Sequence, residues 1–424
     1  MDKQLLKQVM VDNRHDVEQY HVHHRNVDMD SFPCYVLVGV RRAGKSFLLF
    51  QKIQSLLAEG HTWDEIVYLN FEDVRLADFT LADFNSILEC HAELGGKRPI
   101  LFLDEVQNVS GWEKFARNLA DTKHSVFITG SNAKMLSREV MTTLGGRYLS
   151  VEVFPFSFSE CLDFAGVPQD EVSLLSTSGR ADVKRLCAEY LKWGGLPEGV
   201  GLPVRRSYVS STYQKIYLGD ICARYAISNP SILGLLVKKI AESVMQPISY
   251  NRLAKILSSV GGKITTPTVG NYIQYCQDSW LLLRLHNVVA SFAERETISK
   301  FYFVDNGILS LFLMNCDTIL LENAVAVELF RRYGCDPDNE RVFFYNSGVE
   351  VDFYVPEDEL AIQVSYRISA SDSTFDREVG ALRKLPAVKP CRRRMIITYD
   401  EETSVPAEGG DIEVVPFWKW AINR

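Results

Sequence analysis

The stretch 35–49, YVLVGVRRAGKSFLL, constrains the fold of this chain more than any other part of the sequence. An apolar run of strand-forming residues ends at Gly39, a short loop follows, and Gly44, Lys45 and Ser46 open an apolar helix. The pattern G-x-x-x-x-G-K-[ST] requires this succession of strand, loop and helix. Its glycines let backbone N–H groups turn toward phosphates, and the helix N-terminus adds a positive dipole end. The sequence therefore predicts a phosphate-binding loop.

Each residue type in this loop has an expected task. Lys45 would reach the β- and γ-phosphates of a nucleotide, and the Ser46 hydroxyl would bind Mg²⁺. Arg41 and Arg42 are either further phosphate contacts or solvated side chains. The expected nucleotide contacts are Gly39, Arg41, Arg42, Ala43, Gly44, Lys45, Ser46 and Phe47.

Two adjacent carboxylates follow the apolar run 100–103. Four consecutive apolar residues favour a strand that is buried on both faces, as in the centre of a parallel sheet, and the C-terminal end of such a strand would face the phosphate loop. Asp104 is then expected to hold Mg²⁺ through water, and Glu105 to polarise the attacking water. The sequence therefore predicts a catalytic pair of acids at this strand end.

Polar residues at two other strand ends are candidates for the same site. The run 125–129 predicts a strand, and Ser131 or Asn132 directly after it is expected to sense the γ-phosphate. The strand expected over 66–71 has the polar residue Asn70 near its end.

Composition limits the remaining possibilities. A length of 424 residues suggests two to four domains. The net charge of −8 provides no overall field toward nucleic acid or anionic membranes. The nine cysteines include no C-x-x-C pair, so we expect neither a disulfide framework nor a zinc site. No apolar run approaches the roughly 18 residues of a membrane span, which predicts a cytoplasmic protein without a membrane partner.

The order of the motifs resembles the bacterial and archaeal AAA-type ATPases whose C-terminal half has a restriction-endonuclease-like fold. The segments that carry the resemblance are YVLVGVRRAGKS, YLNFED, ILFLDEVQNV, FITGSNAKML, LGGRYLSVEVFPFSFSE and YLKWGGLPE. It extends over nearly the whole chain and implies ATP and Mg²⁺ as cofactors. It also implies that Asn70 holds the catalytic Glu105 in place, the alternative being a polar strand end without a function. It also implies an arginine that completes the site of a neighbouring chain, with Arg147 as the first candidate and Arg138 as the second. A local ion pair of Arg147 is the alternative.

The chain is expected to form four parts. They are a P-loop ATPase core over 1–160, a helical lid or connector over 161–245, a winged helix over 246–295 and an endonuclease-like domain over 296–424. Within the expected winged helix, a second helix would start at Thr266 and Pro267, and 280–285 would be the wing strand. The segment 268–277 of that helix has no arginine or lysine, whereas a DNA-reading helix usually carries such residues. A packing or protein-contact role is therefore favoured for that module.

The endonuclease-like part departs from the active pattern of its family. Strands expected over 349–355 and 360–366 match the D, spacer, (D/E)-x-K layout, with Asp352 in the first position. Gln363 stands in place of the second carboxylate, and Ser365 in place of the lysine. With Glu322 from a preceding helix, these residues form a possible vestigial nuclease site. We expect the fold to persist without hydrolytic competence.

Together the sequence predicts an α/β protein with a P-loop AAA-type ATPase core, a helical lid, a winged-helix module and a C-terminal α/β restriction-endonuclease-like domain. Its expected function is Mg-dependent ATP hydrolysis coupled to conformational change of the degenerate nuclease-like domain. The alternatives are an active ATP-dependent DNA nuclease and a slow nucleotide-dependent switch or scaffold that binds a protein partner. DNA or another protein is the expected partner, and a homo-oligomer is the expected assembly.

Overall fold

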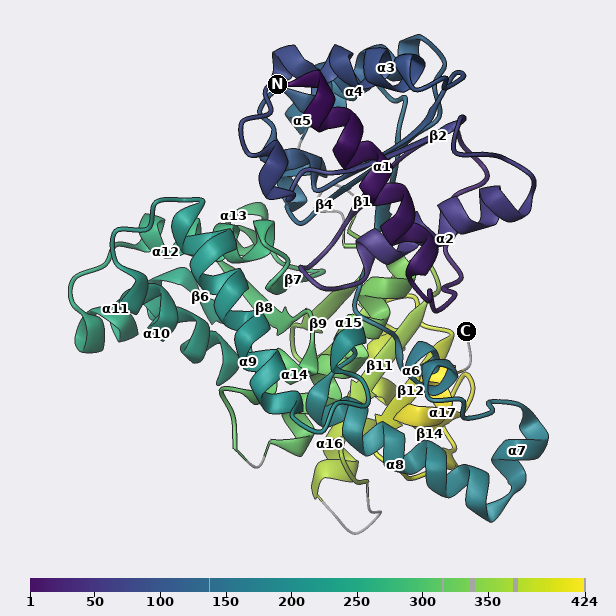
Figure 1. Cartoon of the computed structure of the whole chain (residues 1–424). Coiled ribbons are helices and arrows are strands. Elements are labelled where there is room, and N and C mark those ends of the chain that lie inside the picture. Colours follow the sequence, from purple (N-terminus) through teal and green to yellow (C-terminus); the bar gives the residue numbers. More distant parts are fainter. Residues whose placement is uncertain (137, 315, 336–339, 369–372, 423–424) are drawn as a thin grey trace. The chain divides into compact units, whose positions relative to one another are not determined.

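The computed structural model describes residues 1–136, 138–314, 316–335, 340–368 and 373–422, without the side chains at 134, 136, 138, 139, 373 and 374 (Figure 1). The chain forms two compact units. The first contains residues 1–153 together with 278–280, and the second contains 154–277 together with 281–424. Among the described helices, none has the length and apolar character needed to cross a membrane.

A parallel sheet with the strand order β2-β3-β4-β1-β5 is the centre of the first unit. Its strands are β1 (Cys34–Val38), β2 (Ile66–Asn70), β3 (Ile100–Asp104), β4 (Val126–Gly130) and β5 (Leu149–Glu152). Every residue of β1 and β4 is buried, as continuous apolar runs predict for central parallel strands. The order places the carboxyl ends of β1, β3 and β4 at one edge of the sheet.

Helices and short 3₁₀ turns connect the strands of the first unit. They are α1 (Lys3–Gln19), α2 (Lys45–Ala58), α3 (Phe84–Glu93), α4 (Trp112–Asp121), α5 (Arg138–Leu144), η1 (Val74–Leu76), η2 (Leu81–Asp83), η3 (Val106–Asn108) and η4 (Ala133–Leu136). Helix α1, purple in Figure 1, packs against β2, α2 and α3. The α/β class and the P-loop core expected from the sequence are thereby present in the structure.

The second unit begins with helices. They are α6 (Phe158–Phe164), α7 (Glu171–Leu175), α8 (Thr177–Trp193), η5 (Pro197–Gly199), α9 (Arg205–Lys215), the π-helical η6 (Ile216–Ala223), α10 (Pro230–Ala241), α11 (Tyr250–Gly261) and α12 (Thr266–Asp278). Helix α11 begins where the Ser249 side chain accepts a hydrogen bond from the backbone N–H of Arg252, which is an N-cap.

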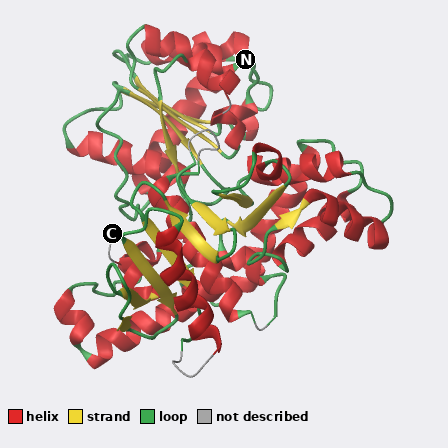
Figure 2. Cartoon of the chain, turned by 180° about the vertical axis from the view of Figure 1, so that it is seen from behind, coloured by secondary structure: helices red, strands yellow, loops and turns green. Residues whose placement is uncertain are grey.

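Strands of the second unit form one mixed sheet in the order β13-β14-β12-β11-β10-β9-β7-β8-β6 (yellow in Figure 2). They are β6 (Ile248–Ser249), β7 (Leu282–Asn287), β8 (Ile298–Phe303), β9 (Phe343–Asn346), β10 (Glu350–Val355), β11 (Leu360–Val364), β12 (Arg393–Thr398), β13 (Thr403–Val405) and β14 (Ile412–Pro416). The remaining helices are α13 (Phe292–Arg295), α14 (Asn306–Ser310), α15 (Asp317–Tyr333), α16 (Ser373–Lys384), η7 (Leu385–Ala387) and α17 (Phe417–Ile422).

This sheet is continuous across the boundary expected at 295/296. Strands β7 and β8, on either side of that boundary, pair antiparallel, and β7 pairs parallel with β9 through His286 and Phe343. Strands β6, β7 and β8 therefore share one sheet with the strands that follow in the chain.

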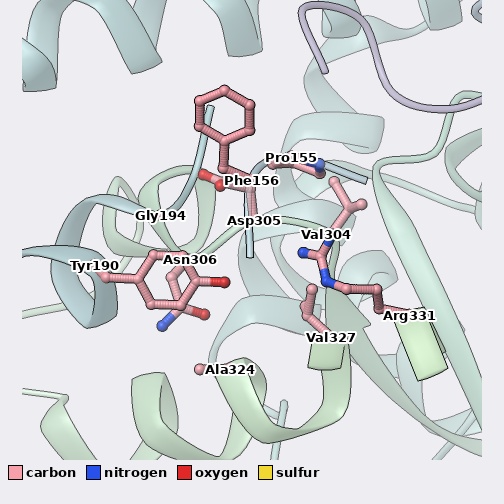
Figure 3. A pocket seen from close by; sticks show the side chains of 10 residues that line it. All are labelled: Pro155, Phe156, Tyr190, Gly194, Val304, Asp305, Asn306, Ala324, Val327 and Arg331. Carbon is pink, nitrogen blue, oxygen red and sulfur yellow. The ribbon is translucent and has the colours of Figure 1, made fainter. Parts of the chain in front are cut away.

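A buried carboxylate explains the glycine pair in the break after α8. The backbone N–H of Gly195 donates to Asp305 Oδ2 at 2.8 Å, and a Cβ at Gly194 would lie 2.1 Å from that oxygen. Asp305, Gly194 and Asn306 line a small cavity of about 10 Å³. Figure 3 shows these lining residues. Burial raises the pKa of Asp305 to about 6, although backbone N–H groups oppose the rise. Gly194 is needed because the carboxylate occupies the space of a side chain, and Gly195 because a Cβ there would lie 2.1 Å from the carbonyl oxygen of Phe156.

Candidate nucleotide-binding site

The loop between β1 and α2 has a backbone that only small residues fit at two points. A Cβ at Gly39 would lie 2.0 Å from the carbonyl oxygen of Val153, so any side chain would clash. Gly44, the N-cap of α2, has φ of 93° in the left-handed region. Arg42 also has a left-handed φ of 64°, and it is exposed to solvent.

Lys45, the first residue of α2, lies with its ammonium between the loop and the end of β3. It is 3% exposed, and its Nζ donates to the carbonyl oxygens of Gly39 and Val40 at 3.1 Å each. The same atom lies 3.6 Å from Glu105 Oε1. The structure thus brings together the cation expected for phosphate and the carboxylate expected for water.

Asp104 ends β3 and is fully buried. Its Oδ2 accepts a hydrogen bond from the Tyr68 hydroxyl at 2.8 Å, and its Oδ1 accepts one from Thr129. Burial, followed by repulsion from the neighbouring Glu105, raises the pKa of Asp104, while hydrogen bonds from Thr129, Ser46 and Tyr68 oppose the rise. Ser46 and Asp104, the two expected Mg²⁺ ligands, are therefore in contact.

Glu105 follows β3 with a left-handed φ of 51°, so the backbone leaves the extended conformation of the strand at this residue. Its backbone N–H donates to Thr129 Oγ1 at 2.9 Å, so one threonine hydroxyl orients both acids. Burial disfavours the charged form of Glu105, but Lys45 and a hydrogen bond from Gln107 outweigh it and lower its pKa. A buried carboxylate that stays ionised is suited to act as a base.

Gln107 holds Glu105, and the sequence did not predict this role. Its Nε2 donates to Glu105 Oε2 and lies 3.4 Å from Ser131 Oγ. A Cβ at Gly130 would lie 2.5 Å from Gln107 Oε1, so the glycine that ends β4 leaves room for this side chain. The only sequence signal was the position of Gln107 inside the ILFLDEVQNV segment, which assigns it no task.

The other polar candidates occupy different positions. Ser131 is buried beside Gln107, and the carbonyl oxygen of Asn132 accepts a hydrogen bond from the backbone N–H of Met135. The Asn70 side chain accepts from the backbone N–H of Glu72 at 2.9 Å, within its own turn. Holding Glu105 therefore falls to Gln107 and not to Asn70.

Arginines near this site have local partners. Arg41 donates to Glu72 at 2.8 Å. Arg147 forms an ion pair with Asp121 at the end of α4 and donates to the carbonyl oxygen of Gly145 at 3.0 Å. The side chain of Arg138 lies outside the described residues. The local ion pair that was the alternative for Arg147 is thus present in this structure.

The four residues of the possible vestigial nuclease site are only partly together. Glu322 on α15 and Asp352 on β10 both approach Lys300 of β8. The amide of Gln363 is bonded to the backbone of β10, and the Ser365 hydroxyl donates to the carbonyl oxygen of Arg367 at 2.7 Å.

Comparison with known proteins agrees with the geometry of the first unit. A family described as an AAA domain matches residues 31–162, and a domain of unknown function, DUF8612, matches residues 184–318. The phosphate loop, the acid pair and this match define the protein as an AAA-type P-loop ATPase. Such ATPases generally bind ATP with Mg²⁺, and the hard oxygen donors of Ser46 and Asp104 suit that ion.

The particular family follows from a relative that matches over the full chain. Uncharacterized protein MJ1544 of Methanocaldococcus jannaschii is 32% identical over 440 residues, which cover 100% of this chain and 96% of the relative. An uncharacterized protein of Haemophilus influenzae is 29% identical over 400 residues, covering 92% and 94%. The chain therefore belongs to the family of the Methanocaldococcus jannaschii protein.

Solved structures give weaker matches. The Walker-type ATPase PABY2304 of Pyrococcus abyssi is 17% identical with a TM-score of 0.37, covering 67% of this chain and 92% of that protein. The Aeropyrum pernix ORC1 protein, solved in complex with DNA, is 15% identical with a TM-score of 0.30, covering 77% and 93%. TM-scores this low carry no argument about function.

Proposed function

We propose that this protein is a cytoplasmic Mg-dependent ATP hydrolase in which Glu105 is the general base. The observation that carries the proposal is the environment of Glu105. Its carboxylate is buried, lies 3.6 Å from Lys45 Nζ and is oriented by Gln107, and its pKa is lowered despite burial. A base prepared in this way can orient a water molecule and accept its proton.

The other residues of the site would bind and position the nucleotide. The backbone N–H groups at the start of α2 and the Lys45 ammonium would hold the phosphates, while Ser46 and Asp104 would hold Mg²⁺. Mg²⁺ supplies charge neutralisation on the phosphates. Asn132, just after β4, would sense the γ-phosphate. Arg147 would leave Asp121 and complete the site of a neighbouring chain in a homo-oligomer.

The second unit would receive the conformational change. The order β6, α11, α12, β7, α13, β8 supports the winged-helix proposal. The order α15, β9, β10, β11, α16, η7, β12 supports the endonuclease-like proposal, because its helices and strands alternate as α-β-β-β-α-β. Helix α12 carries no arginine or lysine, which favours contact with protein over reading of DNA. We infer that ATP hydrolysis moves a degenerate nuclease-like domain rather than a DNA-cleaving one.

Two substitutions in the full-length chain test the ATPase assignment. Lys45→Ala should abolish nucleotide binding because the phosphates lose their cation, measured with a fluorescent ATP analogue. Glu105→Gln should retain that binding and lose about two to four orders of magnitude in the rate of phosphate release. Glu59→Gln, at the opposite end of α2, is the matched control and should leave both unchanged. Full turnover in Glu105→Gln would refute the role of Glu105.

A further inference from the structure

A lysine lies inside the acidic cluster of the second unit. Lys300 is completely buried on β8, and its Nζ lies 3.2 Å from Asp352 Oδ1, 3.7 Å from Glu322 Oε1 and 4.0 Å from Glu350 Oε1. The same ammonium lies 5.6 Å from the ring centroid of Phe344. An ammonium therefore occupies the point on which three carboxylates converge.

Other groups of the cluster have fixed partners. Asp352 Oδ2 accepts a hydrogen bond from the backbone N–H of Val364 at 3.0 Å, so both oxygens of this carboxylate are engaged. Gln363 Oε1 accepts from the backbone N–H of Asp352 at 2.8 Å, and its Nε2 donates to the carbonyl oxygen of Glu350 at 3.0 Å. This amide takes the place of a backbone pairing between β10 and β11, whose register begins at Phe353. Its oxygen is neutral and already accepts a hydrogen bond from the backbone, so it is a poor ligand for a divalent metal.

The charges in the cluster favour the protonated, positively charged form of Lys300. Burial opposes the charge on Lys300, but attraction by the three carboxylates outweighs it and raises the pKa of Lys300. Burial, followed by repulsion from Asp352, raises the pKa of Glu322 to about 8. Tyr302 donates to Glu322 Oε1 at 2.8 Å, whereas Glu322 Oε2 is buried without a hydrogen-bond partner. These acidic side chains therefore hold the Lys300 ammonium firmly.

The Mg²⁺ of an active endonuclease-like centre does not fit these residues as they stand. Mg²⁺ needs charged oxygens at about 2.0–2.1 Å in octahedral geometry. Here the converging oxygens surround a lysine, and among the described residues no group of three or more histidine, cysteine, aspartate or glutamate side chains is arranged to hold a metal. Removal of a buried partner would leave uncompensated charge, which is costly.

We propose that the Lys300 ammonium is a built-in replacement for the divalent cation of an endonuclease-like centre, so that this centre is neutralised from within and binds no metal. The lysine comes from β8, outside the strand pair that carries Asp352 and Gln363. The inference goes beyond ATP hydrolysis. It rests on the proposed endonuclease-like fold in one respect, because an active centre of that fold binds a divalent metal.

The test is Mn²⁺ binding by the full-length protein without nucleotide, measured by electron paramagnetic resonance. Lys300→Met removes the ammonium and retains the volume of the side chain, so Mn²⁺ should bind about tenfold or more tightly than in the unaltered protein. Adding Asp352→Asn to this variant should abolish the gain. Lys238→Met, which changes an exposed lysine on α10, is the matched control and should gain nothing.

Two outcomes would overturn the proposal. One is Mn²⁺ binding by the unaltered protein that disappears on Asp352→Asn, because the metal site would then be intact. The other is a folded Lys300→Met that gains no Mn²⁺. If Lys300→Met does not fold, the single Asp352→Asn variant decides: it should lower the melting temperature without changing Mn²⁺ binding. Omitting nucleotide keeps these results separate from the ATPase assignment.

Discussion

Gln107→Ala is the substitution that best tests how the catalytic carboxylate is positioned. The change removes the side-chain amide that donates to Glu105 Oε2 and lies 3.4 Å from Ser131 Oγ. The loop residues that would hold the phosphates are unaltered. We therefore expect nucleotide affinity to stay the same and turnover to fall.

The size of the effect follows from the kind of hydrogen bond that is lost. A hydrogen bond to a charged group contributes about 1.5–3 kcal/mol, and Glu105 is buried, so solvent does not compensate for its loss. Since about 1.4 kcal/mol corresponds to a tenfold change in rate, kcat should fall roughly 10- to 150-fold. This is less than the loss expected for Glu105→Gln, because the base itself remains.

The dependence of kcat on pH distinguishes a loss of Glu105 positioning from a general disturbance of the fold. Gln107 is one of the groups that lower the pKa of Glu105, after Lys45. Without it the pKa of Glu105 rises, fewer molecules carry the ionised base at acidic pH, and the acid limb of the profile moves to higher pH. Steady-state phosphate release across the pH range measures both kcat and this limb.

A neighbouring residue supplies the control. Asn108→Ala removes the side-chain amide of an exposed residue, which donates to the carbonyl oxygen of Phe71 at 3.3 Å. The substitution keeps the backbone N–H of Asn108, which donates to the carbonyl oxygen of Glu105. The Asn108→Ala variant should have an unchanged kcat and an unchanged acid limb of the pH profile. Wild-type turnover with an unshifted pH profile in Gln107→Ala would refute the positioning role.

Two further predictions concern assembly and stability. Arg147→Ala should leave ATP affinity nearly unchanged and reduce turnover, and mixing with Lys45→Ala chains should restore part of it; turnover independent of protein concentration and without rescue would indicate a monomeric enzyme. Asp305 has a folded pKa of about 6 against its ordinary 3.8, so ionisation should cost about 3 kcal/mol of stability as pH rises from about 4 to about 6. Asp305→Asn should flatten the melting temperature over that range, and an unchanged slope would contradict the assignment.

The strands of the first unit could be predicted because each is a short apolar run followed by a polar motif. The runs before Gly39 and Asp104 correspond to β1 and β3, whose residues are almost all buried. The predicted ends of strands were less accurate at positions where the backbone turns. The wing strand expected from Trp280 begins at Leu282, since Trp280 itself has a left-handed φ of 57°.

Long-range pairing could not be predicted from local pattern. The link between β7 and β9 depends on His286 and Phe343, which are far apart in the chain and carry no shared motif. The same limit applies to the break after α8, where the glycines were visible but their partner Asp305 was not. Spacing rules describe one segment at a time, whereas these contacts join segments.

The sequence indicates that Lys300 is buried, but it does not indicate which residues pair with it. It interrupts the strand ISKFYF, in which Phe301, Tyr302 and Phe303 are all buried. A lysine in such a run must be paired, because an unpaired buried ammonium is too costly. The partner Asp352 is 52 positions away, and only the fold brings it to the ammonium. Ser365 offers no cation, yet an ammonium still lies beside Asp352 and Glu322, because Lys300 comes from another strand.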